Sequence, residues 1–367
     1  MKDILINYFL LIGLTTYLTV LSIPTIKKIG LFYGFVDKPN KKRKFHSKPI
    51  VRLGGLSFAI SFFSATLFAY FLGWFNGDAK ELIKIYSLGS FLFFLVGFSE
   101  DVIKISMKLR LLFQMLISTM VWFYGVQINK IDLSFLFPNY EVFNIPSFAS
   151  FLITVIWIVA ITNAFNWIDG LDGLSSGIAL ITTISFTLLV FSIGISSITL
   201  FMASLIGSCI GFLLFNFYPA KIFMGDGGSY LIGSLIAFFS IFSHNYFINN
   251  NVNQFSFLWQ FLILFVPIVD MIYVFFSRLS EGKSPFYPDR KHFHYRFQRA
   301  GFSTKETVLL AYFCCFLSSG IVFANIFKDF NFIIIAIPSL ILFSFFIVKK
   351  EKTLILGQKF LNKFLNK

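Results

Sequence analysis

Long apolar segments alternate with short polar segments along almost the whole chain. A bilayer core is about 30 Å thick, and a helix of roughly 20 apolar residues crosses it. Eleven segments approach this length, and the ionisable residues gather between them. The pattern therefore predicts an all-α polytopic membrane protein with about eleven transmembrane helices. The predicted spans are residues 4–26, 53–73, 82–99, 109–128, 149–166, 174–193, 198–217, 229–247, 257–277, 306–326 and 331–348.

The composition agrees with a membrane protein. Hydrophobic residues make up 57% of the 367 residues and charged residues only 13%, whereas soluble domains carry about 25% charged residues. The net charge of +14 would suggest nucleic acid in a soluble protein. In a membrane protein basic residues set the topology, so no nucleic-acid partner is expected. Cys209, Cys314 and Cys315 lie in apolar segments without metal-site spacing.

The basic residues lie almost entirely on one predicted side. With the N-terminus outside, all but five of the 31 lysines and arginines fall in segments that face the cytoplasm. This bias follows the positive-inside rule and predicts a cytoplasmic C-terminus. We expect one transmembrane domain over residues 1–348. A basic amphipathic tail over residues 349–367 is expected to lie on anionic lipid.

Five polar segments fall on the predicted cytoplasmic side. The first runs from Asp37 to Gly55 and contains Lys48 and Arg52. Its cations, and the free amides of Gly54-Gly55 at a helix start, suit phosphate. A basic loop that only sets topology has the same composition, so both interpretations stay open here.

The second segment places two adjacent carboxylates, Glu100 and Asp101, before the spaced cations Lys104, Lys108 and Arg110. This order suits a site for phosphate and a metal ion. A solvated turn with local ion pairs is the alternative.

The third segment, from Asn163 to Gly173, puts two carboxamides and two carboxylates into an apolar stretch. An Asp at the centre of a membrane helix costs roughly 2.5–3.5 kcal/mol, so the cluster should lie at the water interface and serve a function. If the helix continues through it, Asn166, Asp169 and Asp172 share one face at three-residue steps.

The fourth segment carries Phe223 and Asp226 among glycines, just before a predicted helix. A carboxylate beside exposed backbone amides suits a hard cation or phosphate.

The fifth segment gathers His292 and His294 among arginines and lysines. It suits an oligophosphate better than zinc, because no Cys or third local His completes a zinc site. No P-loop or dinucleotide fingerprint occurs.

In this order, from about Asp37 to Phe302, the five segments resemble the polyprenyl-phosphate N-acetylhexosamine-1-phosphate transferases of glycosyltransferase family 4. The specific parts are Asn-Ala-x-Asn-x-x-Asp-Gly-x-Asp-Gly and Phe-Met-Gly-Asp-x-Gly-Ser. The stretch Gly-Lys-Ser-Pro-Phe-x-x-Asp-Arg-x-His-x-His looks like the undecaprenyl-phosphate GlcNAc-1-phosphate transferase branch, which starts lipid-linked polysaccharides such as O-antigen or teichoic acid.

The resemblance implies an enzyme that moves a HexNAc-1-phosphate, first of all GlcNAc-1-phosphate, from a UDP-HexNAc to undecaprenyl phosphate and releases UMP. It implies Mg²⁺, with Mn²⁺ as a substitute ion, and membrane lipid as a partner. It also implies a multi-pass protein of the bacterial inner membrane with a cytoplasmic active site. A homodimer stays open. Direct attack by the acceptor phosphate is favoured, and a covalent aspartyl-phosphate route stays open.

The resemblance also assigns site residues by motif match. Asp226 and Asn166 are expected to bind the metal, Phe223 to stack on uracil and Asp172 to hydrogen-bond the uracil. Asp101 is expected either to act as a base or to position the acceptor. The other expected site residues are the catalytic Glu100, Asp169, His292 and His294, and the substrate-binding Lys48, Lys108, Arg290 and Arg296.

Two positions depart from the family pattern: Glu100 stands where the family usually has Asp, and Tyr295 where it often has His.

The main alternative function is a transporter or lipid flippase. Transporters place their sites near the midplane and often carry internal repeats, whereas these polar segments gather on one side and no repeat is evident. A non-catalytic protein that binds lipid phosphate is a further alternative, supported only by the two departures.

Overall fold

A computed structural model describes residues 2–37, 49–132, 142–194, 197–250, 258–287 and 289–327. The chain divides into two compact units, Met1–Gln260 and Phe261–Lys367. Lys48, the predicted span 331–348 and the predicted tail 349–367 lie outside the described residues.

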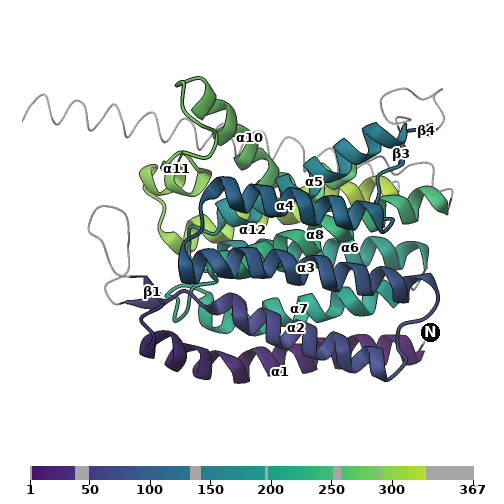
Figure 1. Cartoon of the computed structure of the whole chain (residues 1–367), viewed down its shortest axis with the longest axis horizontal. Helices are drawn as coiled ribbons and strands as arrows, with labels where there is room; N and C mark the ends of the chain where they lie inside the picture. The colour runs from purple at the N-terminus through teal and green to yellow at the C-terminus, as the bar shows by residue number, and fades with distance from the viewer. Residues whose placement is uncertain are drawn as a thin grey trace, which may run out of the picture. The chain divides into compact units, whose positions relative to one another are not determined.

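The first unit is a bundle of helices with two short antiparallel hairpins (Figure 1). Strand β1 (Val36–Asp37) pairs with β2 (Ile50–Val51), and β3 (Lys130–Ile131) pairs with β4 (Phe143–Asn144). The helices of this unit are α1 (Lys2–Phe32), α2 (Gly54–Phe71), α3 (Asp78–Ile103), α4 (Met107–Phe123), α5 (Ser147–Ile168), α6 (Leu174–Ile193), α7 (Ser197–Asn216) and α8 (Gly225–Asn249).

Helix α9 (Leu258–Ile263) crosses the boundary between the units. The second unit contains α10 (Phe265–Leu279), α11 (Phe293–Arg299) and α12 (Thr304–Ile326), and both α10 and α11 pack against α12. Ser303 begins α12 with a capping box: its side chain accepts a hydrogen bond from the N–H of Glu306, whose carboxylate accepts one from the N–H of Ser303.

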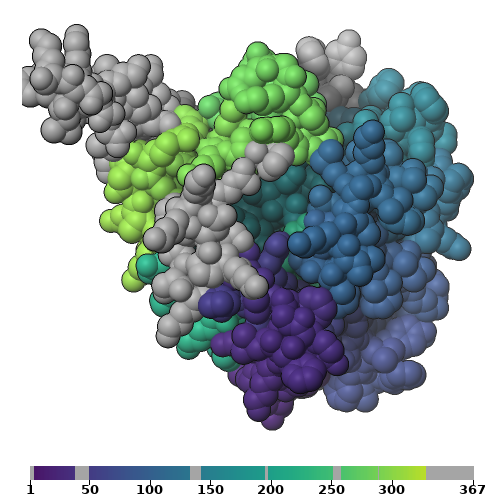
Figure 2. Space-filling model, turned by 60° about the vertical axis from the view of Figure 1, so that its left-hand side comes forward, coloured from purple at the N-terminus to yellow at the C-terminus, as the bar shows by residue number. Residues whose placement is uncertain are grey.

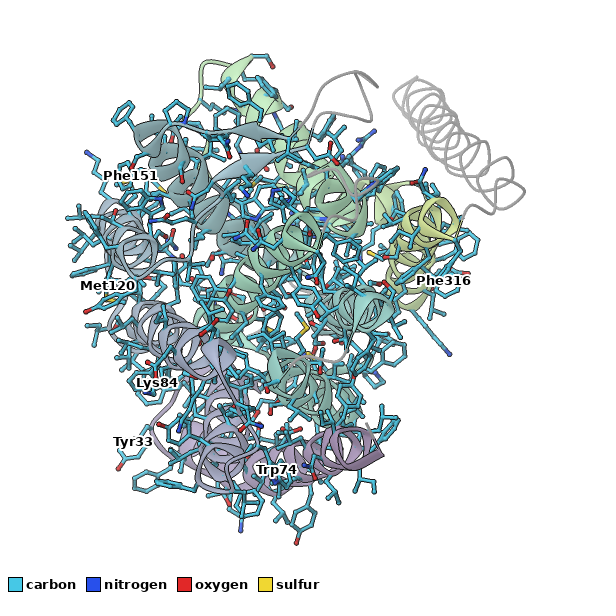
Figure 3. All side chains as sticks on the ribbon, turned by 90° about the vertical axis from the view of Figure 1, so that its right-hand side faces the viewer. Tyr33, Trp74, Lys84, Met120, Phe151 and Phe316 are labelled. Atoms are coloured by element: carbon cyan, nitrogen blue, oxygen red, sulfur yellow. The ribbon has the colours of Figure 1, made fainter. Side chains whose placement is uncertain are left out.

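Among the described residues, eight helices are long and apolar enough to cross a membrane, as a multi-pass membrane protein requires. Ten of the predicted spans coincide with described helices, the span 257–277 being shared by α9 and α10. The full number of spans and the orientation of the termini stay predictions. Many large apolar side chains are exposed, as on a surface that faces lipid. Tyr33 and Met120 lie on the outer edge of the first unit in Figure 3.

Helix α8 is enclosed by α2, α3, α5 and α6 over most of its surface. Glycine allows one of the closest of these contacts, because a Cβ on Gly97 of α3 would overlap the backbone carbonyl of Asp226. Gly97 therefore brings the last turn of α3 directly beside the first turn of α8. Since residues four apart share a helix face, the same contact turns Asp101 toward α8.

Small residues also form the contact between α1 and α7. Thr16 Oγ1 donates to the carbonyl of Gly207 at 3.0 Å, and a Cβ on Gly207 would overlap Thr15. Gly211, one helical turn further, packs on Thr19. Small residues at this spacing let two membrane helices pack closely. Such packing matters in a bilayer, because the hydrophobic effect does not drive helices together in lipid.

The segment from Asn163 to Gly173 differs from the continuous helix considered above. Helix α5 ends at Ile168, and the following residues form a turn that closes at Gly173, with φ of +79°. The break agrees with the predicted spans 149–166 and 174–193, and the shared helix face that a continuous helix would give Asn166, Asp169 and Asp172 does not form. Glycine supplies the left-handed conformation that this turn needs.

Candidate active site

Four of the five polar segments meet at one end of the first unit. The Gly54 N–H donates to the Phe223 carbonyl (2.9 Å), and the Phe223 N–H donates to the Val51 carbonyl (2.8 Å), which joins the first segment to the fourth. Side-chain bonds from Asp101 and Asp172 bring the second and third segments to the same place. In Figure 2 the surface of the first unit is hollowed at this end, between the purple α1 and the blue α3 and α4.

Asp101 caps the helix that carries Asp226. Its Oδ1 accepts a hydrogen bond from the Asp226 N–H (3.0 Å), and its Oδ2 accepts one from the Gly227 N–H (2.9 Å). A carboxylate on the free N–H groups of a helix start is favourable both as a cap and through the helix dipole. The side chain is only 2% exposed. This geometry gives Asp101 a structural role at the start of α8, while its expected roles as a base or in positioning the acceptor stay predictions.

Two arginines neutralise Asp226, which lies in the first turn of α8. Its Oδ2 lies 2.7 Å from Arg110 Nη1, and its Oδ1 lies 3.6 Å from Arg52 Nη2. Arg52 Nη2 also lies 3.8 Å from Asp101 Oδ1. The motif match assigned a role to neither arginine. The only signal for them in the sequence is their place in the two basic segments.

Glu100 supplies the other carboxylate of the adjacent pair. Among the described residues its buried Oε2 has no hydrogen-bond partner, and neither has Arg110 Nε. A buried polar atom without a partner costs about 1–3 kcal/mol unless a ligand, ion or water completes it. Of the two adjacent carboxylates, Glu100 is therefore the one with an oxygen left for a ligand.

Asn166 is linked to Asp226 through Ser229. Asn166 Nδ2 donates to Ser229 Oγ (3.0 Å), and Ser229 Oγ donates to the Asp226 backbone carbonyl (3.1 Å). This bond uses the nitrogen of the carboxamide, so its oxygen is the atom that suits a cation. Ser229, the last residue of the Phe-Met-Gly-Asp-x-Gly-Ser motif, thus connects the two predicted metal ligands, Asn166 and Asp226.

Magnesium fits these residues only together with a phosphate ligand. Within the part of the chain that the structure describes, no group of three or more His, Cys, Asp or Glu side chains is arranged to hold a metal by itself. Magnesium commonly uses one or two carboxylates and completes its shell with water and substrate phosphate. Asp226, Asn166 and the partnerless oxygen of Glu100 match that donor set. Arg110 already places positive charge on the Asp226 carboxylate.

Asp169 follows the last residue of α5 and is partly buried. Burial raises the pKa of Asp169 to about 8, and the negative charge of Asp226 adds to the shift. Arg52 opposes it. At neutral pH this carboxyl is therefore largely protonated, and it can donate a hydrogen bond or exchange a proton near physiological pH.

Asp172 and Asn216 join the turn after α5 to the loop before α8. Asp172 Oδ2 accepts a hydrogen bond from the Ala220 N–H (2.9 Å). Asn216 Oδ1 accepts from the Gly173 N–H (3.0 Å), and its Nδ2 donates to the Ile222 carbonyl (2.9 Å). One oxygen of Asp172 is thus engaged in holding the loop that carries Phe223. The predicted contact of Asp172 with uracil stays a prediction.

The second unit holds the fifth segment. His292 Nδ1 lies 2.7 Å from Asp270 Oδ2, and its Nε2 lies 3.4 Å from Arg278 Nη2. Arg278 in turn binds both carboxylate oxygens of Asp289, at 3.0 and 3.1 Å. Although burial opposes the shift, the hydrogen bond from Arg278 keeps the pKa of Asp289 below its usual value. His292 is therefore held on both ring nitrogens.

His294 has a different environment. It is 1% exposed and stacks on His292 with the ring centroids 5.5 Å apart. Neither ring nitrogen has a hydrogen-bond partner among the described residues. Burial lowers the pKa of His294 to about 3, so the ring is neutral at physiological pH. A neutral, partnerless imidazole is available to a ligand that brings its own polar groups.

The remaining predicted residues lie at the edges of these clusters. Lys108 is exposed on the first turn of α4, and Phe223 is half-buried. Arg290 lies over the ring of Tyr295, and Arg296 over the ring of Tyr273, with 5.9 and 4.6 Å to the ring centroids. Tyr295, at the position where the family often has His, thus serves here as a surface for an arginine.

Asp270 lies in none of the five polar segments. It is a single carboxylate inside the predicted span 257–277, and it is buried. The cost of an ionisable group at membrane depth was the signal that could have identified it.

Comparison with known proteins agrees with the motifs. The model of the family described as glycosyl transferase family 4 matches residues 83–244. A Bacillus subtilis (strain 168) protein named "Probable undecaprenyl-phosphate N-acetylglucosaminyl 1-phosphate transferase" is 33% identical over 83% of this chain and 82% of its own length.

Two enterobacterial proteins named undecaprenyl-phosphate alpha-N-acetylglucosaminyl 1-phosphate transferase are also similar. The Yersinia pestis protein is 31% identical over 77% of this chain and 75% of its own length. The Escherichia coli (strain K12) protein is 28% identical over 80% of this chain and 77% of its own length. With these similarities over most of its length, the chain belongs to the polyprenyl-phosphate N-acetylhexosamine-1-phosphate transferases of glycosyl transferase family 4.

Proposed function

We propose that this enzyme transfers a HexNAc-1-phosphate, first of all GlcNAc-1-phosphate, from a UDP-sugar to undecaprenyl phosphate and releases UMP. The observation that carries the proposal is the meeting of Asp226, Asn166 and Glu100 with Arg52 and Arg110 at helix ends of one unit. The names of the relatives support the same donor sugar and acceptor lipid. The reaction would open the synthesis of a cell-envelope polysaccharide.

The reaction exchanges one phosphoanhydride bond for another. An oxygen of the acceptor phosphate attacks the phosphorus that carries the sugar, a new P–O bond forms, and the bond from this phosphorus to the bridging oxygen breaks. UMP leaves with that oxygen. Such transfers depend mainly on positioning and charge neutralisation. The second pKa of a phosphate monoester is near ~6, so the acceptor is largely dianionic at neutral pH and needs no strong base.

Each site residue of the first unit would have a separate role in this reaction. Asp226 and Asn166 would hold magnesium, which supplies charge neutralisation for the diphosphate and the leaving phosphate. Arg52 and Arg110 lie beside Asp226 and would bind phosphate oxygens once a cation takes over the carboxylate. Asp101 keeps the first turn of α8 in place. Glu100 would contact the ligand with its partnerless oxygen.

The remaining predicted contacts belong to the same proposal. Phe223 would stack on uracil and Asp172 would hydrogen-bond it. Lys108, Arg290 and Arg296 would contact phosphate, and His292 and His294 would contact the diphosphate. The site would face the cytoplasm at the inner membrane of a bacterium, where the basic segments gather.

A reconstituted assay tests the proposal. Purified enzyme in nanodiscs receives undecaprenyl phosphate, Mg²⁺ and one of several UDP-N-acetyl sugars, and UMP is measured with the lipid product. We expect UMP with UDP-GlcNAc, none without the lipid, and none after chelation of the metal. Release of UMP from another UDP-HexNAc alone would reassign the sugar. No UMP from any of them would overturn the proposed function.

A further inference from the structure

A pair of buried amides lies one helical turn deeper in the first unit than the candidate site. Asn163 Nδ2 donates to Gln114 Oε1 at 2.6 Å and so joins α5 to α4. Gln114 follows Arg110 by four residues, and Asn163 precedes Asn166 by three. Each amide therefore shares a helix face with a residue of the site. One turn rises only about 5.4 Å, so the pair lies close behind the groups that would bind the diphosphate.

The hydrogen bonds determine which way each amide faces. Asn163 Nδ2 also donates to the Val159 carbonyl at 2.8 Å, and a carbonyl only accepts, so this atom is the nitrogen. Gln114 meets it with its oxygen and turns its own nitrogen away. Both bonds of the Asn163 side chain use the nitrogen, which leaves Oδ1 as an acceptor. The pair thus offers a donor on Gln114 and an acceptor on Asn163.

The side-chain nitrogen of Gln114 is buried without an acceptor. The residue is 1% exposed, and its Nε2 has no hydrogen-bond partner among the described residues. The Tyr230 phenol of α8 lies beside this amide and is close enough to Arg110 and Asp226 for their charges to act on it. An amide nitrogen carries two hydrogens, so one remains even where the phenol accepts the other. A buried donor of this kind is costly, which indicates that a ligand completes it.

The chemistry of the pair selects the kind of ligand. Two amides carry no charge, whereas phosphate and magnesium are served by the arginines and the carboxylate beside them. A neutral group with one carbonyl and one N–H fits, because it can accept from Gln114 and donate to Asn163. The acetamido group of a HexNAc is such a group. It belongs to a sugar that is bonded directly to the diphosphate.

We propose that Gln114 and Asn163 bind the acetamido group of the donor sugar, with Gln114 Nε2 donating to its carbonyl and Asn163 Oδ1 accepting its N–H. This inference rests on the proposed function. The amide pair is then the part of the site that separates an N-acetylhexosamine from a plain hexose. Such a site rejects an analogue without the group, because its own buried polar atoms are left unpaired.

The binding of two nucleotide sugars tests the pair without turnover. UDP-GlcNAc and UDP-Glc differ only at the acetamido group, and their Kd values are measured with Mg²⁺ and without acceptor lipid. Gln114→Met keeps the length of the side chain but has no N–H. We expect it to weaken UDP-GlcNAc at least about fivefold and UDP-Glc less than about twofold. The control Ser118→Ala removes a bond to the Gln114 backbone carbonyl, one turn further along α4, and should keep the wild-type ratio.

A second variant, Gln114→Glu, keeps the acceptor for Asn163 and removes only the donor. Its charge acts on both nucleotides alike and cancels in the ratio of their Kd values, so the ratio should change as in Gln114→Met. Equal weakening of both nucleotides, or an unchanged ratio, would mean that the amides support the fold or contact uracil. Either result overturns the inference while the proposed function stands. Absence of UMP in the reconstituted assay with wild-type enzyme overturns the proposed function instead.

Discussion

Asp101 and Asp226 are joined through the backbone, since the Asp101 carboxylate accepts the Asp226 N–H at 3.0 Å and so fixes the start of α8. The adjacent carboxylates therefore have different surroundings. Asp101 is engaged inside the protein, whereas Glu100 keeps an oxygen without a partner among the described residues. Glu100 stands where the family usually has the shorter Asp, and it is the member of the pair that can reach a ligand.

Replacing Asp101 by Asn should lower stability and activity together. The amide leaves one of the two helix N–H groups without an acceptor, which costs about 1–2 kcal/mol. We expect a lower Tm and a lower kcat, with no change in the shape of the pH–rate profile. Ser303→Ala, which removes the cap of α12, is the matched control and should lower Tm without lowering kcat. An Asp101→Asn enzyme with wild-type Tm and no activity at any pH would instead favour a base role.

Arg110→Gln should strengthen metal binding and weaken catalysis. Arg110 pairs with the Asp226 carboxylate at 2.7 Å, so it competes with a cation for the same oxygen. Removal of one charge at about 4 Å is worth about 1 kcal/mol even in water, or roughly fivefold in affinity. Binding of Mn²⁺ followed by electron paramagnetic resonance should tighten at least by that factor, while kcat falls. Unchanged or weaker Mn²⁺ binding would refute this competition.

The pH dependence of stability should report Asp169. Its folded-state pKa of about 8 lies above the value near 3.9 of an unfolded chain. Between these values the folded state binds the extra proton, so stability falls as pH rises from about 4 to about 8. Asp169→Asn should flatten the dependence of Tm on pH over this range. Asp78→Asn, at an exposed carboxylate that begins α3, should keep the wild-type slope. Equal slopes in wild type and Asp169→Asn would disprove the shift.

Gly97→Ala should disturb the site from outside it. The added Cβ would overlap the carbonyl of Asp226, and overpacking of this kind costs about 1–3 kcal/mol. We expect a lower Tm and a lower kcat, because α3 and the first turn of α8 must separate. Gly13→Ala in α1 is the control, since nothing lies within 4 Å of its new Cβ. Similar losses in both variants would point to a general effect of helix glycines.

Much of the fold could be predicted from apolar segment length alone, because a membrane helix must satisfy its backbone internally and be long enough to cross. The break between the spans 149–166 and 174–193 could also be predicted, but the form of the turn at Asp169–Gly173 could not, since it depends on tertiary bonds such as Asn216 to Gly173. Asp270 likewise carries no motif. Its partner is His292, which is 22 residues away in sequence and adjacent only after folding.

The motifs predicted which residues belong to the site better than what each residue does. Asn166 and Asp226 are linked through Ser229, and Glu100 keeps an oxygen without a partner among the described residues, while the roles that the resemblance implied for them stay predictions. The cap formed by Asp101 and the arginine pair on Asp226 depend on side-chain directions at helix ends, which residue spacing does not determine.

The contact at Gly97 ties the site to the lipid around it. Asp101 and Asp226 stand on the ends of two apolar helices that touch backbone to backbone there, with no loop between them to absorb a change. Tilting is one way in which such helices adapt to a thicker or thinner bilayer. A change of tilt in either helix would move the carboxylates relative to one another, so we expect turnover to depend on the acyl-chain length of the surrounding lipid as well as on substrate and metal.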